Sequence, residues 1–171
     1  MHGVSVNVRR GRAEEVGAIM VLIARCVEAM QAGGSDQWDE HYPSREIIAA
    51  DLAAGTLYVC EEEGEVAAIV VLDEKQAGQY AGIIWAEREG PQLVMHRLAV
   101  HPDRQGRGHA RRLIAFAEAC ANEQGYAAIR LDTYERNVSA LKLYTSLGYD
   151  RRGEIDFPGR TGCFPVFEKV L

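Results

Sequence analysis

Residues 97–110 read RLAVHPDRQGRGHA and join a β-rich apolar run to the clearest helical pattern in the chain. The run before them, residues 93–100, predicts a strand that His101-Pro102 ends, and residues 108–124 carry an apolar stripe at helical spacing. Gly106 and Gly108 lie between the two. Glycines allow close approach of a ligand to the backbone, and the unpaired amides and dipole at a helix start attract anions. The segment therefore predicts a strand–turn–helix unit that cradles a pyrophosphate.

The turn lacks both common nucleotide-binding glycine patterns, G-x-x-x-x-G-K-[ST] and G-x-G-x-x-G. Taken alone, its glycines fit an ordinary tight junction equally well. Arg104, Arg107, Arg111 and Arg112 nevertheless form a local cationic patch on a chain whose net charge is −6. A basic patch on an acidic protein indicates a small anionic ligand and argues against nucleic acid as a partner.

Helical and strand patterns alternate along the rest of the chain, without repeats or a linker. We expect a strand near residues 4–8, helices over 13–31 and from Ser44 to Gly55, and a hairpin of residues 56–61 and 65–72. A strand over 128–134, a helix capped by Asn137 and strands near 149–154 and 164–170 follow. The order β-α-α-β-β-β-α-β-α-β-β predicts an α/β protein with a mixed sheet, in a single domain over residues 1–171.

The composition indicates the class of the protein and its location in the cell. Hydrophobic residues make up 47% and charged residues 26% of the chain, as in globular proteins. No apolar run approaches the roughly 18 residues of a membrane span, and no secretory signal is evident, so we expect a cytoplasmic protein without membrane partners. Four scattered cysteines, without histidines at metal-ligand spacing, predict reduced thiols and no metal site.

Two motifs resemble the GNAT acetyltransferase superfamily. Residues 105–110, QGRGHA, match its Q/R-x-x-G-x-G/A signature, and residues 98–102, LAVHP, look like the strand before it. Residues 137–149, NVSALKLYTSLGY, resemble the family's N-x-x-A-x-x-x-Y-x-x-x-G-[FY] helix. The resemblance covers nearly the whole chain and is weakest before Thr56. It implies the GNAT acyl-CoA N-acyltransferase fold, a central twisted mixed sheet of six to seven strands flanked by about four helices.

The resemblance further implies an acetyl-CoA-dependent N-acetyltransferase. Backbone amides of the glycine loop would bind the pyrophosphate, and the backbone of Leu98 and Val100 would pair with the pantetheine arm. Asn137 would reach the same arm, and Tyr144 would lie near the thioester sulfur. The residues expected to bind acetyl-CoA are Leu98, Ala99, Val100, Arg104, Gln105, Gly106, Arg107, Gly108, His109, Ala110, Arg111, Asn137 and Tyr144.

The acid and base of acetyl transfer come from different parts of the sequence. The phenol of Tyr144 suits a proton donor for the leaving thiolate, although a tyrosine on a helix stripe also suits a core. Family members often place a carboxylate on the strand before the loop, but LVMHRLAV has none, so His96 is the candidate base. Glu87, Glu89 and a water chain are the alternatives. A backbone N–H near Leu98 would stabilise the oxyanion if the strand bulges there.

Aromatic residues in polar, turn-rich segments are the candidates for binding the acceptor: Trp38, Tyr42, Trp85 and Phe157. Anchoring loops to the core explains them equally well. The leading acceptor is a primary amine of a small molecule, and the alternative is a protein N-terminus or lysine. A non-catalytic acyl-CoA sensor is a third reading, and a homodimer is left open.

Overall fold

The computed structural model describes residues 3–171 and contains one seven-stranded sheet in the order β1-β2-β3-β4-β5-β7-β6. The strands are β1 (Val6–Arg10), β2 (Leu57–Glu62), β3 (Glu65–Asp73), β4 (Gln92–Val100), β5 (Ala128–Asp132), β6 (Asp150–Ile155) and β7 (Phe164–Val170). Only β4 and β5 pair in parallel within this sheet. The predicted mixed sheet and the predicted order of elements are confirmed.

Four α-helices accompany the sheet: α1 (Val16–Ala32), α2 (Arg45–Ala54), α3 (His109–Gln124) and α4 (Val138–Ser146). The expected helix signals act as predicted at α2, where the Ser44 hydroxyl accepts from the amide of Ile47 and Gly55 adopts a left-handed conformation. The first strand, β1, begins at Val6, two residues later than the strand expected near residues 4–8. Residues 13–15 form a 3-10 turn before α1 because Glu15 caps the Arg12 amide.

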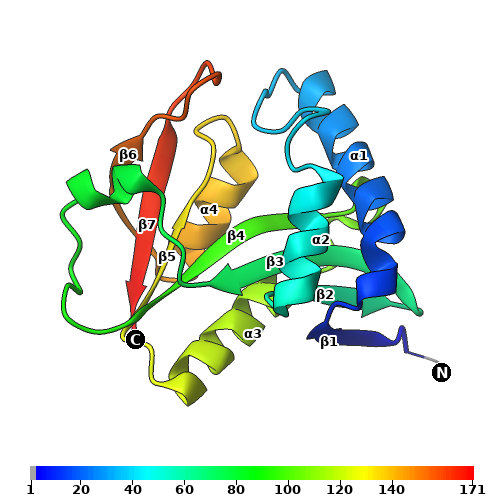
Figure 1. Ribbon diagram of the computed structural model, residues 1–171, viewed down its shortest axis with the longest axis horizontal. Helices are drawn as coiled ribbons and strands as arrows, with labels where there is room; N and C mark the ends of the chain where they lie inside the picture. Colours follow the sequence, from blue (N-terminus) through cyan, green and yellow to red (C-terminus); the bar gives the residue numbers. More distant parts are fainter. Residues whose placement is uncertain (1–2) are drawn as a thin grey trace.

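Alternating side chains divide the core between the two faces of the sheet. Leu57, Val59 and Ile69 face α1 and α2, whereas Cys60, Ala68 and Val70 face α3. Figure 1 shows α1 and α2 together over the β1–β4 half of the sheet, with α4 beside β5 and β7. A third cluster packs the segment after β3, with Tyr80 and Trp85, against residues of β4, β6 and β7. These layers leave the C-terminal ends of β4 and β5 at the centre of the molecule.

Candidate active site

The parallel strands β4 and β5 stop pairing halfway along β4. Their register runs from Gln92 opposite Ala128 to Met95 opposite Leu131, whereas β4 continues to Val100. On the other side, Ile69 pairs with Ala99 and Val71 with His96, so β4 contains an extra residue. The bulge on which the oxyanion hypothesis depends is therefore present next to Leu98. Beyond it, the β5-facing edge of β4 offers backbone groups to an extended ligand.

Arg97 forms this bulge and is held in an unusual conformation. Its φ is 52°, in the left-handed region that non-glycine residues rarely adopt. The guanidinium donates to both carboxylate oxygens of Asp51 on α2, each at 2.9 Å, and to the Tyr42 hydroxyl at 3.2 Å. Both members of the ion pair are largely buried. The pair therefore fixes the bulge to α2.

Removing this carboxylate should destabilise the protein. We expect Asp51→Ala to lower the free energy of unfolding by about 2 to 3 kcal/mol, because the Arg97 charge stays largely buried without its partner. Urea unfolding measures this loss. Asp103→Ala is the control, since Asp103 pairs with Arg25 at 3.4 Å on the exposed surface and should change stability by less than about 1 kcal/mol. Equal losses in both variants would contradict a structural role for the buried pair.

The glycine loop adopts the conformation for which glycine is needed. Gly106 and Gly108 have φ values of 77° and 83°, and Gly108 directly precedes the first residue of α3. A side chain at either position would strain the backbone. Because Gly108 brings no capping side chain, the first amides of α3 are free to bind an anion. Gln105, Gly106, Gly108, Ala110 and Arg111 line the adjoining cavity.

Two arginines of the expected cationic patch point elsewhere. Arg104 and Arg107 each donate to the buried carboxylate of Glu62 at 2.8 Å, and His109 lies 3.1 Å from the same carboxylate. Arg104 and Arg107 were expected among the acetyl-CoA-binding residues, through contact with a phosphate or through their field alone; in the structure both side chains are paired with Glu62, and the His109 ring lies against the same carboxylate. Sequence reasoning missed Glu62 because it lies on β2, more than 40 positions before the loop.

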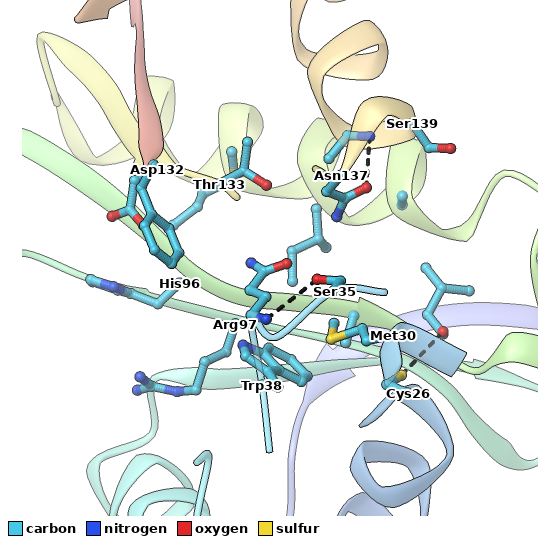
Figure 2. Close-up of a pocket in the computed structure, with 18 of the residues that line it drawn as sticks. Cys26, Met30, Ser35, Trp38, His96, Arg97, Asp132, Thr133, Asn137 and Ser139 are labelled. Carbon is cyan, nitrogen blue, oxygen red and sulfur yellow. Dashed lines mark hydrogen bonds between the residues drawn. The ribbon is translucent and has the colours of Figure 1, made fainter. Parts of the chain in front are cut away.

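A cavity of about 1160 Å³ runs from this loop past β4 to the far ends of β5 and α4. Figure 2 shows Cys26, Met30 and Trp38 on one side of it, and Asp132, Thr133, Asn137 and Ser139 on the other. The Asn137 side-chain oxygen accepts from the Ala140 amide and caps α4. Leu98, Ala99, Val100, Asn137 and Tyr144 all line the cavity, as the sequence predicts for a cosubstrate channel.

Tyr144 brings a hydroxyl to the cavity wall. Its ring is buried against Tyr149 and Phe167, with centroids 5.8 Å away in both cases. Within residues 3–171 the hydroxyl has no hydrogen-bond partner. Burial, and then the nearby charge of Asp132, raise the pKa of Tyr144 above its ordinary value. The phenol therefore stays protonated at neutral pH and is free to donate.

Two carboxyl groups that sequence reasoning missed, Asp73 and Asp132, lie near His96. Its Nε2 lies 2.8 Å from Asp73 at the end of β3, and Asp132 lies on the neighbouring strand β5. Burial favours protonation of Asp73, but the hydrogen bond and charge of His96 outweigh it and lower the pKa. Burial raises the pKa of Asp132, against the hydrogen bond donated by Tyr80 at 2.6 Å. His96, Asp73 and Asp132 all line the cavity.

The alternative bases do not lie at the cavity. Glu87 accepts from the amides of Glu89 and Gly90, and neither glutamate is among the lining residues. The position of Asp132 at the end of an apolar strand, parallel to the strand of His96, was the signal available in the sequence. This signal identifies Asp132 as a neighbour of His96 only when the strand order is known, because that order places β5 next to β4.

Three of the four aromatic candidates line the cavity: Trp38, Tyr42 and Phe157. Trp85 does not line the cavity, so the prediction that it contacts the acceptor is wrong. The ring is buried, stacks on the Arg130 guanidinium at 4.1 Å and donates its N–H to the carbonyl of Tyr80 at 3.0 Å. For Trp85, the alternative reading of a core anchor is the one that the structure supports.

Two loops that both line the cavity, one with Trp38 and the other with Arg160, are joined by hydrogen bonds. Asp36, in the α1–α2 loop, accepts from the Thr161 amide at 3.0 Å and from the Tyr134 hydroxyl. Asp39 of the same loop accepts from Arg160 at 2.9 Å. Because Arg160 and Thr161 belong to the β6–β7 loop, these bonds join the two loops into a bridge.

Residues 23–149 match the model of the acetyltransferase (GNAT) family. The chain belongs to this family. The solved GNAT acetyltransferase from Streptococcus agalactiae superposes with a TM-score of 0.82 at 26% identity, over 97% of this chain and 95% of the other. The family and the fold expected from the two motifs are confirmed.

More distant structures share the fold of this GNAT chain. The Drosophila melanogaster polyamine N-acetyltransferase, which forms N-acetylagmatine, has a TM-score of 0.74 at 19% identity, over 98% of this chain and 100% of the other. The PaiA N-acetyltransferase of Thermoplasma acidophilum, solved with coenzyme A, has a TM-score of 0.73 at 15% identity, over 98% and 99%.

Curated relatives match over a shorter span. Rat N-acetyltransferase family 8 member 2 is 30% identical over 104 residues, which are 59% of this chain and 41% of the relative. The chain thus spans less than half the length of that relative. No helix within residues 3–171 is long and apolar enough to cross a membrane.

Proposed function

We propose that the protein transfers the acetyl group of acetyl-CoA to a primary amine of a small molecule, by direct attack of the amine in a ternary complex. The observation that carries the proposal is a single cavity that joins the glycine loop, the unpaired edge of β4 and Tyr144. The left-handed glycines and the free amides at the start of α3 fit a pyrophosphate, and the open edge fits an extended pantetheine arm. The coenzyme A bound to the Thermoplasma acidophilum relative supports the same donor.

Each group at the site has a task in this reaction. The thioester supplies an activated acyl carbon to which the amine nitrogen bonds as the carbon–sulfur bond breaks. An amine with a pKa of about 10.4 must first lose a proton, which His96 is placed to accept. A backbone N–H at the bulge would stabilise the carbonyl oxygen as it gains charge. Tyr144 would give its proton to the departing sulfur and recover one from solvent.

The loop bridge favours a small acceptor over a peptide. Asp36 and Asp39 bind across to Thr161 and Arg160, and both of these loops contribute residues to the cavity lining. If the amine enters between the two loops, an extended polypeptide would need a groove that the bridge closes, whereas a small molecule would not. Arg97, Arg136 and Arg160 of the cavity lining are each paired with a carboxylate, and Lys75 lines the cavity as well. Asp73, whose pKa is lowered by His96, is the carboxylate that would attract a cationic amine.

An acceptor panel tests the function. The purified protein is incubated with acetyl-CoA and polyamines, amino acids, aminoglycosides or short peptides, and CoA release and product mass are measured. We expect turnover of at least one class of small amine. Acetylation of peptides alone would support the protein acetyltransferase alternative. Tight binding of acetyl-CoA without turnover of any acceptor would support the non-catalytic sensor.

Substitution of the phenol tests the proposed acid. We expect Tyr144→Phe to lower kcat by at most about 100-fold, while acetyl-CoA binds as in the wild type, because only the unpartnered hydroxyl is removed. Tyr149→Phe is the matched control. That hydroxyl binds Glu118 at 3.3 Å in the same core, outside the cavity lining, and its loss should leave kcat unchanged. Full activity of Tyr144→Phe at every pH would exclude Tyr144 as the acid.

Location and assembly are further parts of the proposal. We propose that the protein is cytoplasmic and that residues 1–171 form one domain. Its assembly state, monomer or homodimer, is the part to be measured. Light scattering of the purified chain measures its assembly state directly.

A further inference from the structure

Glu62 is a buried carboxylate with no part in the reaction as described. It is the last residue of β2, and its side chain is only 4% exposed. The guanidiniums of Arg104 and Arg107 donate to it from one side, and the His109 ring completes the set. These three residues belong to the segment that precedes and begins α3. The Glu62 carboxylate, at the end of a sheet strand, therefore binds three side chains from the glycine loop and the start of α3.

The opposite side of the same loop faces the cavity. Gln105, Gly106, Gly108 and His109 line the cavity, whereas Arg104 and Arg107 do not. The His109 side chain is fully buried, so this residue borders the cavity with its backbone. The His109 ring is held from a second direction, since its Nδ1 lies 3.4 Å from the Cys60 sulfur. The charged side chains thus tie the loop to the sheet and leave its backbone turned toward the ligand.

The contacts favour the charged form of Glu62. Its hydrogen bonds with Arg104 and then Arg107 outweigh burial and lower the pKa of Glu62 to about 2. The carboxylate therefore stays ionised at neutral pH. The loop it holds contains two left-handed glycines, which leave the free chain many alternative conformations. A binding loop of this kind gains affinity when its bound conformation is fixed beforehand.

We propose that Glu62 is a positioning residue for acetyl-CoA. It holds residues 104–109 in the conformation whose amides bind the pyrophosphate, and it keeps Arg104 and Arg107 away from the phosphates. This inference rests on the proposed use of acetyl-CoA. The affinity of the loop then comes from backbone amides and the helix start rather than from these two arginines.

Glu62→Gln, compared with Glu65→Gln, tests the inference. Glu65 binds only Arg104, from the exposed end of β3, and serves as the matched control. Calorimetry measures the acetyl-CoA Kd, and steady-state kinetics separate kcat from KM. For Glu62→Gln we expect Kd and the acetyl-CoA KM to rise about 10-fold, because charged hydrogen bonds that order the loop are lost. The kcat at saturating acetyl-CoA and the KM for the amine should stay near wild type, as should every parameter of Glu65→Gln.

The direction in which the acetyl-CoA Kd of Glu62→Gln changes distinguishes a positioning role of Glu62 from direct phosphate binding by the arginines. If Arg104 and Arg107 bind the phosphates directly and Glu62 only restrains them, Glu62→Gln frees them and the acetyl-CoA Kd falls. A lower or an unchanged Kd would overturn the positioning role, and so would a loss confined to kcat. A wild-type protein that binds no acetyl-CoA would overturn the proposed function itself, and the role of Glu62 with it.

A second variant covers the case in which Glu62→Gln folds poorly. Glu62→Asp keeps the charge and shortens the side chain by one methylene. We expect its acetyl-CoA Kd to rise about 3-fold, since the hydrogen bonds lengthen without leaving the arginines unpaired. Thermal unfolding of both variants shows whether the protein is folded at the assay temperature. A Glu62→Asp variant that is folded and binds acetyl-CoA as tightly as the wild type would overturn the inference.

Discussion

Gly108→Asp should weaken acetyl-CoA binding by about 100-fold or more. Position 108 precedes the first turn of α3, so the new carboxylate would lie where the pyrophosphate is expected. Two like charges about 4 Å apart repel by about 4 kcal/mol at an effective dielectric constant of 20, and each 1.4 kcal/mol is a factor of ten in affinity. Calorimetric titration with acetyl-CoA measures the loss.

The fold should survive this substitution. A Cβ at Gly108 would come no closer than 3.6 Å to another residue, the Arg112 guanidinium, so there is space for it. Aspartate tolerates the left-handed conformation better than most residues, and carboxylates stabilise helix N-termini. Gly108→Asn is the matched control, because it has the same shape without the charge. We expect it to lose at most about 10-fold in affinity, the strain cost of a side chain at positive φ. Equal losses for Asp and Asn would show that no anion binds at this helix start.

The sequence predicted those features that depend on neighbouring residues. The Ser44 cap, the Gly55 stop and the two glycines of the loop each follow from local conformational preferences, and the structure contains all four. The mixed sheet follows from the alternation of strand and helix patterns. Tyr144 and Asn137 reach the same cavity as the loop because one helix carries both at fixed spacing.

Features built from distant residues could not be predicted in this way. Glu62 and Asp73 lie at the ends of β2 and β3, in segments whose local pattern indicates only a hairpin. Their roles depend on which distant residues the fold brings beside them, namely Arg107 of the glycine loop in one case and His96 of β4 in the other. A count of charges along the chain treats Arg104 and Arg107 as free, although both are paired across more than 40 positions.

These pairings change the electrostatic account of the site. The positive potential at the loop comes chiefly from the amides at the start of α3, and Arg111 is the arginine of the expected cationic patch that lines the cavity. At the other end, Asp73, whose pKa is lowered by His96, leaves negative charge in the cavity. One cavity thus has an anion-binding end and a cation-binding end. This division suits a reaction between an anionic donor and a cationic amine.

His96→Gln should lower kcat/KM for the amine by about 100- to 1,000-fold, within the roughly 10²- to 10⁴-fold that general acid–base catalysis supplies. A carboxylate only accepts hydrogen bonds, so the Nε2 that faces Asp73 must carry a proton, which leaves Nδ1 as the atom that can take one. Glutamine keeps a hydrogen-bond donor for Asp73 but accepts no proton. Acetyl-CoA affinity should stay near wild type, because the variant leaves the loop and the edge of β4 intact.

The pH dependence identifies the base. As pH rises toward the amine's pKa of about 10.4, more of the acceptor is already neutral, so the deficit of His96→Gln should shrink. Glu87→Gln, outside the cavity lining, should match the wild type at every pH. The competing base is Asp132, whose pKa is raised by burial and which lines the same cavity. If Asp132→Asn shows the pH-dependent deficit and His96→Gln does not, the base is Asp132, and His96 serves to hold Asp73 in its charged form.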